Sequence, residues 1–189
     1  MKRYVIKIQY NSPVVLTFAL LALGALGLGI LTDGDTTMRY FSVYRAPLTD
    51  PLTWLRFFTH VLGHADYNHY IGNMLLILVV GPPLEEKYGS RSLLLAIVIT
   101  ALVSGLVQFI FFPGVALLGA SGIVFMMIVM SSLAGMKSRC IPLTLIFVVV
   151  FYLGGEIVAG LFSPDNVSQL THIVGGVCGA VIGYIFYGK

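Results

Sequence analysis

Residues 117–125 read LLGASGIVF and place one hydroxyl, that of Ser121, between glycines in an otherwise apolar run. The stretch just before it, from Phe112 to Ala120, is also apolar, but a Pro-Gly pair interrupts it. Such breakers predict a loop, so that a helix starts only near the serine. Ser121 is therefore either a small packing residue in an apolar helix or a functional residue whose hydroxyl takes part in the protein's chemistry.

The composition is that of a membrane protein. Of the 189 residues, 58% are hydrophobic and 10% are charged, whereas soluble domains carry about 25% charged residues. The mean hydropathy is +0.94. We therefore expect an all-α, polytopic protein in the lipid bilayer. No basic run indicates a nucleic-acid partner, and the two cysteines, Cys140 and Cys178, suggest neither a disulfide framework nor a C-x-x-C metal site.

Six apolar segments are long enough, or nearly so, to cross a membrane, because a spanning helix needs about 20 residues. We expect one integral-membrane domain over residues 1–189. The first segment follows basic residues, as a signal peptide does, but its apolar run is too long for one, so we interpret it as a helix. A Gly-Pro-Pro sequence favours an early end to the second. The segments are 13–31, 68–83, 92–112, 121–136, 141–162 and 168–187.

The basic residues predict the orientation of these helices. With the N-terminus inside, eight of the eleven Lys and Arg residues fall in cytoplasmic segments, as the positive-inside rule requires. Both termini are then cytoplasmic, and we expect the cell inner (plasma) membrane. The first outer loop, residues 32–59, is long and combines aromatic residues with scattered charges. That composition is typical of an amphipathic element lying in the interface.

Three polar residues on three different helices are predicted to lie at one depth. Each precedes a charge at the cytoplasmic end of its helix by 16 or 17 positions, which is about 24–26 Å at the helical rise. The hydrocarbon core is roughly 30 Å thick, so all three lie a little below the outer surface. The pairs of polar residue and charge are Ser121 with Lys137, His172 with Lys189, and His69 with Glu85.

The helix ends supply chemistry at that depth. A helix that begins at Ser121 inside the bilayer presents free N–H groups and a positive dipole end, which suit a developing oxyanion. In the last segment, Gly175, Gly179 and Gly183 recur every fourth residue, three positions after His172. Small residues at that spacing let another helix approach closely. If that helix is the one starting at Ser121, the imidazole reaches the hydroxyl and can act as its base.

Four sequence elements together resemble the rhomboid intramembrane serine proteases of the bacterial six-helix type. The likeness covers roughly residues 54–187. It implies an endopeptidase that cleaves transmembrane segments of membrane proteins near the outer membrane face, without a cofactor or a metal. The elements are GASG at 119–122, H-x-x-x-N at 69–73, HIVGGVCG at 172–179 and EEKYGS at 85–90, the last in the loop after the second helix.

The resemblance also assigns roles to residues. Ser121 would be the nucleophile and His172 the general base of a dyad, and the oxyanion hole would combine the Ser121 N–H with His69 and Asn73. The family often has an adjacent Trp-Arg pair in the first outer loop, where this chain has Trp54-Leu55-Arg56. The supporting residues are Gly119 and Gly122 beside the serine, Phe125 stacked on the histidine where the family often has tyrosine, Gly175 and Gly179 on the packing face, and Glu85 and Gly89 in a structural loop motif.

Other interpretations remain for several of these residues. His172 could be a satisfied core histidine, and His69 with Asn73 could hydrogen-bond neighbouring helices. His60 and His64 have a spacing that can chelate zinc, but they lack the glutamate of the H-E-x-x-H signature, so we favour structural hydrogen bonds near the outer interface. Glu156 is interpreted as a carboxylate that reaches the outer interface, or as one that faces a lateral opening.

Two other functions are compatible with the segment pattern. A non-enzymatic member of the same fold could bind membrane helices for quality control, although it would be expected to lack the serine or the histidine. A small transporter could line a polar path with the His, Asn and Ser side chains, but it should show paired broken helices and internal repeats. We find no convincing repeat. The sequence does not define the oligomeric state.

Overall fold

The computed structural model describes residues 9–136, 140–154, 158 and 167–186. The regular elements of these residues are helical, as the sequence predicts, and Val43 and Leu117 add an isolated antiparallel β-bridge. The elements are α1 (Pro13–Leu31), α2 (Asp35–Tyr40), α3 (Pro51–Thr59), the 3-10 turn η1 (His60–Leu62), α4 (Tyr67–Tyr88), α5 (Ser90–Phe111), α6 (Ser121–Ala134), α7 (Leu143–Phe147), the π-helical turn η2 (Val148–Leu153) and α9 (Val167–Ile185).

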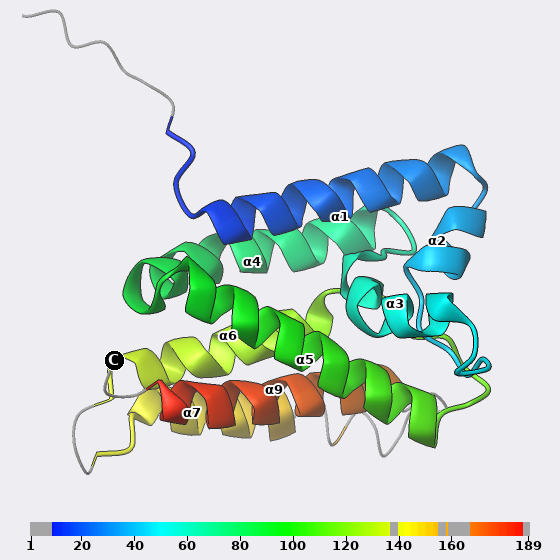
Figure 1. Cartoon of the computed structure of the whole chain (residues 1–189). Coiled ribbons are helices and arrows are strands. Elements are labelled where there is room, and N and C mark those ends of the chain that lie inside the picture. The colour runs from blue at the N-terminus through cyan, green and yellow to red at the C-terminus, as the bar shows by residue number, and fades with distance from the viewer. Residues whose placement is uncertain (1–8, 137–139, 155–157, 159–166, 187–189) are drawn as a thin grey trace, which may run out of the picture.

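The long helices alternate in direction (Figure 1). α1 and α5 run one way, and α4, α6 and α9 run the other way. α6 is in contact with α4 and α5 and packs most extensively against α9. As a result, the first turns of α4, α6 and α9 lie at the same end of the bundle. His69 and Ser121 lie in the first turns of α4 and α6, and His172 lies in the second turn of α9.

Several predicted segments coincide with helices. α1 and α5 are long and apolar enough to cross a membrane, whereas α6 and the part of α9 from Gln169 to Ile185 are apolar but shorter. The ends predicted for α1, α5, α6 and α9 are within two residues of those in the structure. In the described part of segment 141–162, α7 follows Pro142 directly and continues into η2. Glu156 lies outside the described residues.

The second predicted helix is longer than the sequence analysis expects. α4 continues through Pro82 and Pro83 to Tyr88, so the expected end at residue 83 is wrong, and EEKY lies in the last turns of α4 and not in a loop. Proline keeps φ near the helical value although it removes a donor. The helix ends instead at Gly89, whose φ of +81° favours glycine.

Glu85 ties the last turns of α4 to two other helices. Its side-chain oxygens accept hydrogen bonds from the N–H groups of Val14 and Val15, at 3.0 Å each, and from the Ser90 hydroxyl at 2.7 Å. The first N–H groups of a helix have no partner within it, so the carboxylate caps α1. Glu85 is 4% exposed. This buried carboxylate fixes the part of α4 beyond its prolines against the starts of α1 and α5.

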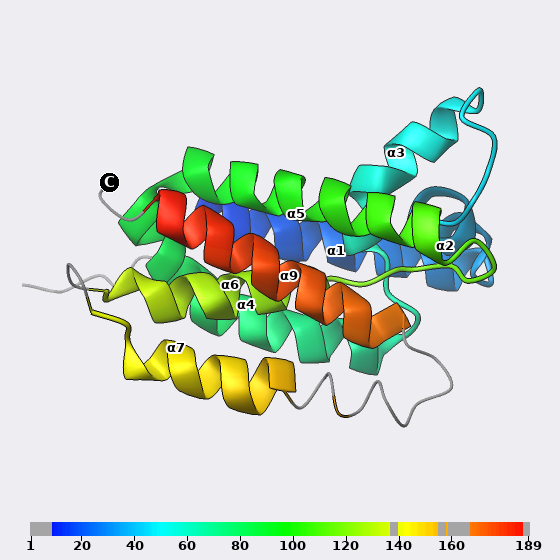
Figure 2. The same cartoon turned by 90° about the horizontal axis from the view of Figure 1, so that it is seen from below.

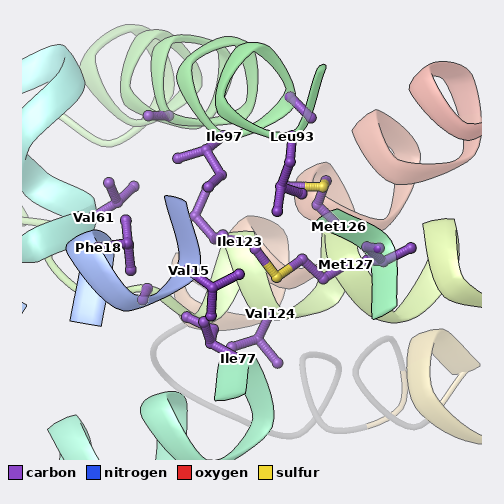
Figure 3. Packing of buried hydrophobic residues seen from close by; sticks show 14 of the residues in the cluster. Val15, Phe18, Val61, Ile77, Leu93, Ile97, Ile123, Val124, Met126 and Met127 are labelled. Carbon is purple, nitrogen blue, oxygen red and sulfur yellow. The ribbon is translucent and has the colours of Figure 1, made fainter. Parts of the chain in front are cut away.

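The core lies where α1, α4, α5 and α6 meet. Figure 3 shows Val15 of α1, Ile77 of α4 and Val124 of α6 close together, and each is at most 3% exposed. A Cβ atom on Gly81 would lie 2.7 Å from Cγ2 of Val15. This glycine therefore lets α1 approach α4 closely, as small residues do between membrane helices.

The segment of residues 32–59 is held together around Arg56. This side chain is 4% exposed, and its Nε donates to the Arg39 carbonyl at 2.8 Å. Its guanidinium also lies 3.6 Å from the Asp50 carboxylate and over the Tyr44 ring. Residues 32–59 thus form α2 and α3 around one buried cation, the guanidinium of Arg56. This arginine lies two residues after Trp54 and not directly beside it.

We predict that Glu85→Ala destabilises the protein by about 2–4 kcal/mol, because two helix N–H groups lose their acceptor in a buried site. Glu86→Ala is the matched control, because Glu86 is the exposed neighbour on the same turn. The midpoint of thermal unfolding in detergent measures the effect. Equal midpoints for the two variants would contradict the capping role.

Candidate active site

Ser121 is the first residue of α6, as the sequence predicts, and it is half-buried. The chain reaches it through an irregular segment that is fixed at two points. Leu117 exchanges two backbone hydrogen bonds with Val43, and the N–H of Gly119 donates to the His60 carbonyl at 2.9 Å. The first N–H groups of α6 have no acceptor within the helix. A donor-rich backbone therefore surrounds the hydroxyl.

Gly119 brings this backbone onto His69. Its φ of +124° is a conformation that L side chains rarely adopt, and a Cβ atom there would lie 2.8 Å from both Cε1 and Nε2 of His69. A side chain at this position would therefore be strained and would also collide with the imidazole. The glycine allows the loop before Ser121 to lie directly against the ring.

The imidazole of His69 is oriented by the turn that starts α4. The Asp66 side chain accepts a hydrogen bond from the backbone N–H of His69 at 2.8 Å, and the backbone N–H of Ala65 donates to Nδ1 of the His69 ring at 3.5 Å. A neutral imidazole that accepts at Nδ1 carries its proton on Nε2. The Nε2 edge, which faces Gly119, is then a hydrogen-bond donor toward the segment that carries Ser121.

Asn73 follows His69 one helical turn later. It is 7% exposed, and its Nδ2 is buried without a hydrogen-bond partner among the described residues. A buried amide donor without an acceptor costs free energy, so its presence calls for an explanation. One explanation is a ligand that brings an acceptor to this donor. His69 and Asn73 together offer two side-chain donors from one face of α4.

α9 supplies the histidine on the other side of the site. The rings of His172 and Phe125 are stacked, with centroids 4.4 Å apart and planes 8° from parallel. Phe125 lies four residues after Ser121, on the same face of α6. The structure therefore brings Ser121, His172 and His69 to one region, and Phe125 fixes the plane of the His172 ring.

The glycine stripe of α9 packs against α6. A Cβ atom on Gly175 would lie 2.1 Å from the carbonyl oxygen of Gly122, and one on Gly179 would lie 2.4 Å from that of Met126. A Cβ atom on Gly122 would lie 3.2 Å from Thr171. The two backbones are in direct contact, so the face predicted from the four-residue spacing does meet the helix of Ser121.

His60 and His64 occupy structural positions beside this region. His60 Nε2 lies 3.0 Å from the Ala101 carbonyl, and His64 Nδ1 lies 3.1 Å from that of Leu62. Burial lowers the pKa of each ring to about 4, assisted at His64 by the neighbouring His69, so both are neutral at pH 7. They lie on a 3-10 turn and a loop rather than one helix, and no group of three potential metal ligands is present among the described residues.

One contribution to the site was missed in the sequence analysis. The carbonyl of His60, rather than its ring, holds Gly119. A backbone acceptor carries no signature in residue type, so no sequence pattern identifies it. The sequence analysis considers only the ring of this histidine, as a zinc ligand or as a structural hydrogen-bonding group.

A family comparison matches these features. Residues 51–189 fit the model of the rhomboid domain. The chain belongs to the rhomboid family. The matched part contains α3 to α9 and thus His69, Asn73, Ser121 and His172.

Three relatives show the range of the similarity to other rhomboid proteins. The chain is 34% identical over 69% of its length to "Rhomboid-related protein 1" of Caenorhabditis elegans, and 31% identical over 74% to "Rhomboid-related protein 2" of Mus musculus. It is 27% identical over 80% of its length to "Rhomboid protease GlpG" of Serratia proteamaculans. The matches cover 39%, 53% and 55% of these proteins, so the chain spans about half the length of the relatives or less.

We predict that Gly175→Ala separates α6 from α9, because its methyl group has no space beside the Gly122 carbonyl. Overpacking of this kind costs about 1–3 kcal/mol or more. Gly24→Ala on α1 is the matched control, because nothing lies within 4 Å of the position of its Cβ atom. Thermal unfolding in detergent should show a lower midpoint for Gly175→Ala alone. A midpoint unchanged from the parent protein would contradict the close packing.

Proposed function

We propose that this rhomboid protein is an intramembrane serine protease that cleaves transmembrane segments of membrane-protein substrates near the outer face of the membrane. The observation that carries the proposal is the seam between α6 and α9. There Ser121 begins a helix, and His172 lies in the same seam, stacked on Phe125 from the next turn of α6. His69, whose ring lies against Gly119 just before Ser121, and Asn73, one turn later on α4, would contribute donors to this seam.

The chemistry needs only groups that the chain supplies. Ser121 Oγ attacks the scissile carbonyl carbon while His172 takes the hydroxyl proton, which activates an otherwise weak nucleophile. His172 then gives this proton to the leaving amine, and an acyl-enzyme remains. A water molecule, deprotonated by His172, attacks the ester, and the proton returns to Ser121 as the acid product leaves. The dyad requires neither a third acidic member nor a cofactor.

Three donors would stabilise the negative charge that develops on the carbonyl oxygen. They are the backbone N–H of Ser121, Nε2–H of His69 and Nδ2–H of Asn73. Donors that are already positioned stabilise a transition state without reorganisation. The buried, unpartnered amide of Asn73 supports this role, since among the described residues its donor has no other task.

The supporting residues hold this geometry. Gly119 lets the loop reach His69, and Gly122, Gly175 and Gly179 bring α9 onto α6. Phe125 orients the general base through ring stacking. A tyrosine hydroxyl is absent at position 125, so we assign the orientation to the aromatic face alone.

We further propose that residues 1–189 form one integral-membrane domain with six membrane-crossing segments and both termini in the cytoplasm. The segment of α7 and η2 would be the fifth. The host is the cell inner (plasma) membrane, and residues 32–59 lie at its outer interface. Substrate segments would enter laterally near α7. The length of α6 supports this placement, because its 14 residues span about 21 Å, which is less than the roughly 30 Å of the hydrocarbon core.

We predict that Ser121→Ala and His172→Ala each lower kcat for a model transmembrane substrate by at least about a thousandfold, since removal of one member of a catalytic unit costs nearly as much as removal of all. Asn73→Ala should lower it by about a hundredfold, as loss of one oxyanion donor does. Asn68→Ala, at an exposed position on the same helix, is the matched control and should cleave normally.

The assay uses purified protein in detergent, gel analysis of cleavage, and covalent labelling by a fluorophosphonate probe. Labelling and cleavage that persist in both Ser121→Ala and His172→Ala would exclude the dyad. A protein that binds transmembrane helices but shows neither labelling nor cleavage would instead be the non-enzymatic type of rhomboid protein. Loss of cleavage with a chelator would require a metal mechanism.

A further inference from the structure

A cavity of about 280 Å³ lies between α4, α6 and α7, away from the residues of the candidate active site. Its lining residues are Val80 of α4, Ile128, Ser131 and Ser132 of α6, and Thr144 of α7. Three of these five side chains carry hydroxyl groups. Ser132 lies eleven positions after Ser121 on the same helix, so the cavity is about 16 Å nearer the opposite end of the bundle.

The hydroxyl groups make this cavity unusual for a membrane-embedded surface. Ser132 donates to the Ile128 carbonyl at 3.0 Å, which leaves its oxygen free to accept. Ser131 and Thr144 are exposed, and each hydroxyl can donate and accept. A serine hydroxyl that bonds to a carbonyl of its own helix is satisfied without any contact to another helix. Here, however, hydroxyls from two helices face one space large enough for a side chain.

A membrane-embedded chain can reach this cavity. α7 packs on α6 at the edge of the bundle (Figure 2), and none of its residues is buried. Leu143 and Phe147 are 63% and 51% exposed. A transmembrane segment that approached between α4 and α7 would therefore meet the exposed side chains of Ser131 and Thr144 directly, and it would leave the core intact.

We propose that this cavity is a substrate subsite that selects a hydrogen-bonding side chain, such as Asn, Gln or Ser, in the inner half of the substrate's transmembrane segment. We call it the inner subsite, formed by Val80, Ile128, Ser131, Ser132 and Thr144. The inference rests on the proposed function, because it requires a substrate whose scissile bond lies at Ser121. A polar side chain of the substrate is unfavourable in hydrocarbon unless it forms a hydrogen bond. The hydroxyl groups of the inner subsite would supply that bond and so favour a polar side chain over an apolar one.

The depth of the inner subsite fixes the register of the selected side chain. If the substrate is helical from the scissile bond inward, the side chain lies about 11 residues away at 1.5 Å per residue. If the substrate is extended over the whole distance, at about 3.3 Å per residue, it lies about 5 residues away. A partly unwound substrate falls between these limits.

The test scans one asparagine through a leucine-rich model segment, from 4 to 13 residues from the scissile bond toward its cytoplasmic end. Cleavage is measured in proteoliposomes as kcat/KM relative to the all-leucine substrate. We expect one position, or two adjacent ones, at which asparagine raises kcat/KM about three- to tenfold, the range that interhelical hydrogen bonds provide. A flat profile would overturn the inference.

The triple variant Ser131→Ala, Ser132→Ala, Thr144→Val assigns the preference to the cavity. The ratio of kcat/KM for the asparagine and leucine substrates should fall to about one, whatever the absolute rates. Thr17→Val, which removes an exposed hydroxyl from α1, is the matched control and should keep the ratio. A preference that survives in the triple variant would overturn the inference. Cleavage that is independent of Ser121 would instead overturn the proposed function.

A cross-linking experiment provides a readout that does not depend on activity or on a preference. Ser132→Cys is placed in a background of Ser121→Ala and Cys140→Ser, because Cys140 is exposed. Substrates with single cysteines are then oxidised in the same vesicles. Disulfide-linked complexes should form at the register that asparagine selects and fall off on both sides. Uniform cross-linking along the segment, or cross-linking at the outer end alone, would overturn the inference.

Discussion

The backbones of α6 and α9 are in direct contact at Gly122 and Gly175, and the arrangement of the site depends on that contact. A Cβ atom on Gly175 would lie 2.1 Å from the Gly122 carbonyl oxygen. Ser121 adjoins Gly122, and His172 lies one turn before Gly175. The two helices cannot separate without moving the hydroxyl away from the imidazole. In a bilayer, where lipid is as apolar as the side chains, such close backbone packing is a main source of helix association.

The remaining contacts connect the site to η1 and α5. The His60 carbonyl holds the N–H of Gly119, and the ring of His60 lies against the Ala101 carbonyl of α5. The segment before Ser121 is therefore fixed by groups outside the seam. At the opposite end, Glu85 joins α4 to the starts of α1 and α5. The polar groups of the site are thus supported by backbone contacts and buried hydrogen bonds on both sides.

Much of this arrangement could be predicted from the sequence, because the bilayer restricts what a polar residue can do. Distance from a cytoplasmic charge indicated the shared level of His69, Ser121 and His172, and the four-residue spacing of glycines indicated the packing face of α9. These signals depend on helical geometry alone. The structure brings the residues into one region, and their catalytic roles remain the proposal tested above.

Other features could not be predicted, for identifiable reasons. Gly81-Pro82-Pro83 indicated a helix end, but α4 continues to Tyr88, and Glu85 in this continuation bonds to α1 residues some 70 positions away. No local pattern reports such a contact. The acceptor for Gly119 is a backbone carbonyl, and the cavity beside Thr144 depends on how α7 packs against α6. These features depend on tertiary packing and not on residue type or period.

The most direct test of the central claim is a structure of the protein with a fluorophosphonate bound covalently. We predict a bond from phosphorus to Ser121 Oγ and a phosphoryl oxygen within about 3 Å of both Asn73 Nδ2 and His69 Nε2. We also expect the His172 ring to lie beside Ser121 Oγ and to remain stacked on Phe125. An adduct on another residue, or a phosphoryl oxygen that points away from α4, would contradict the account.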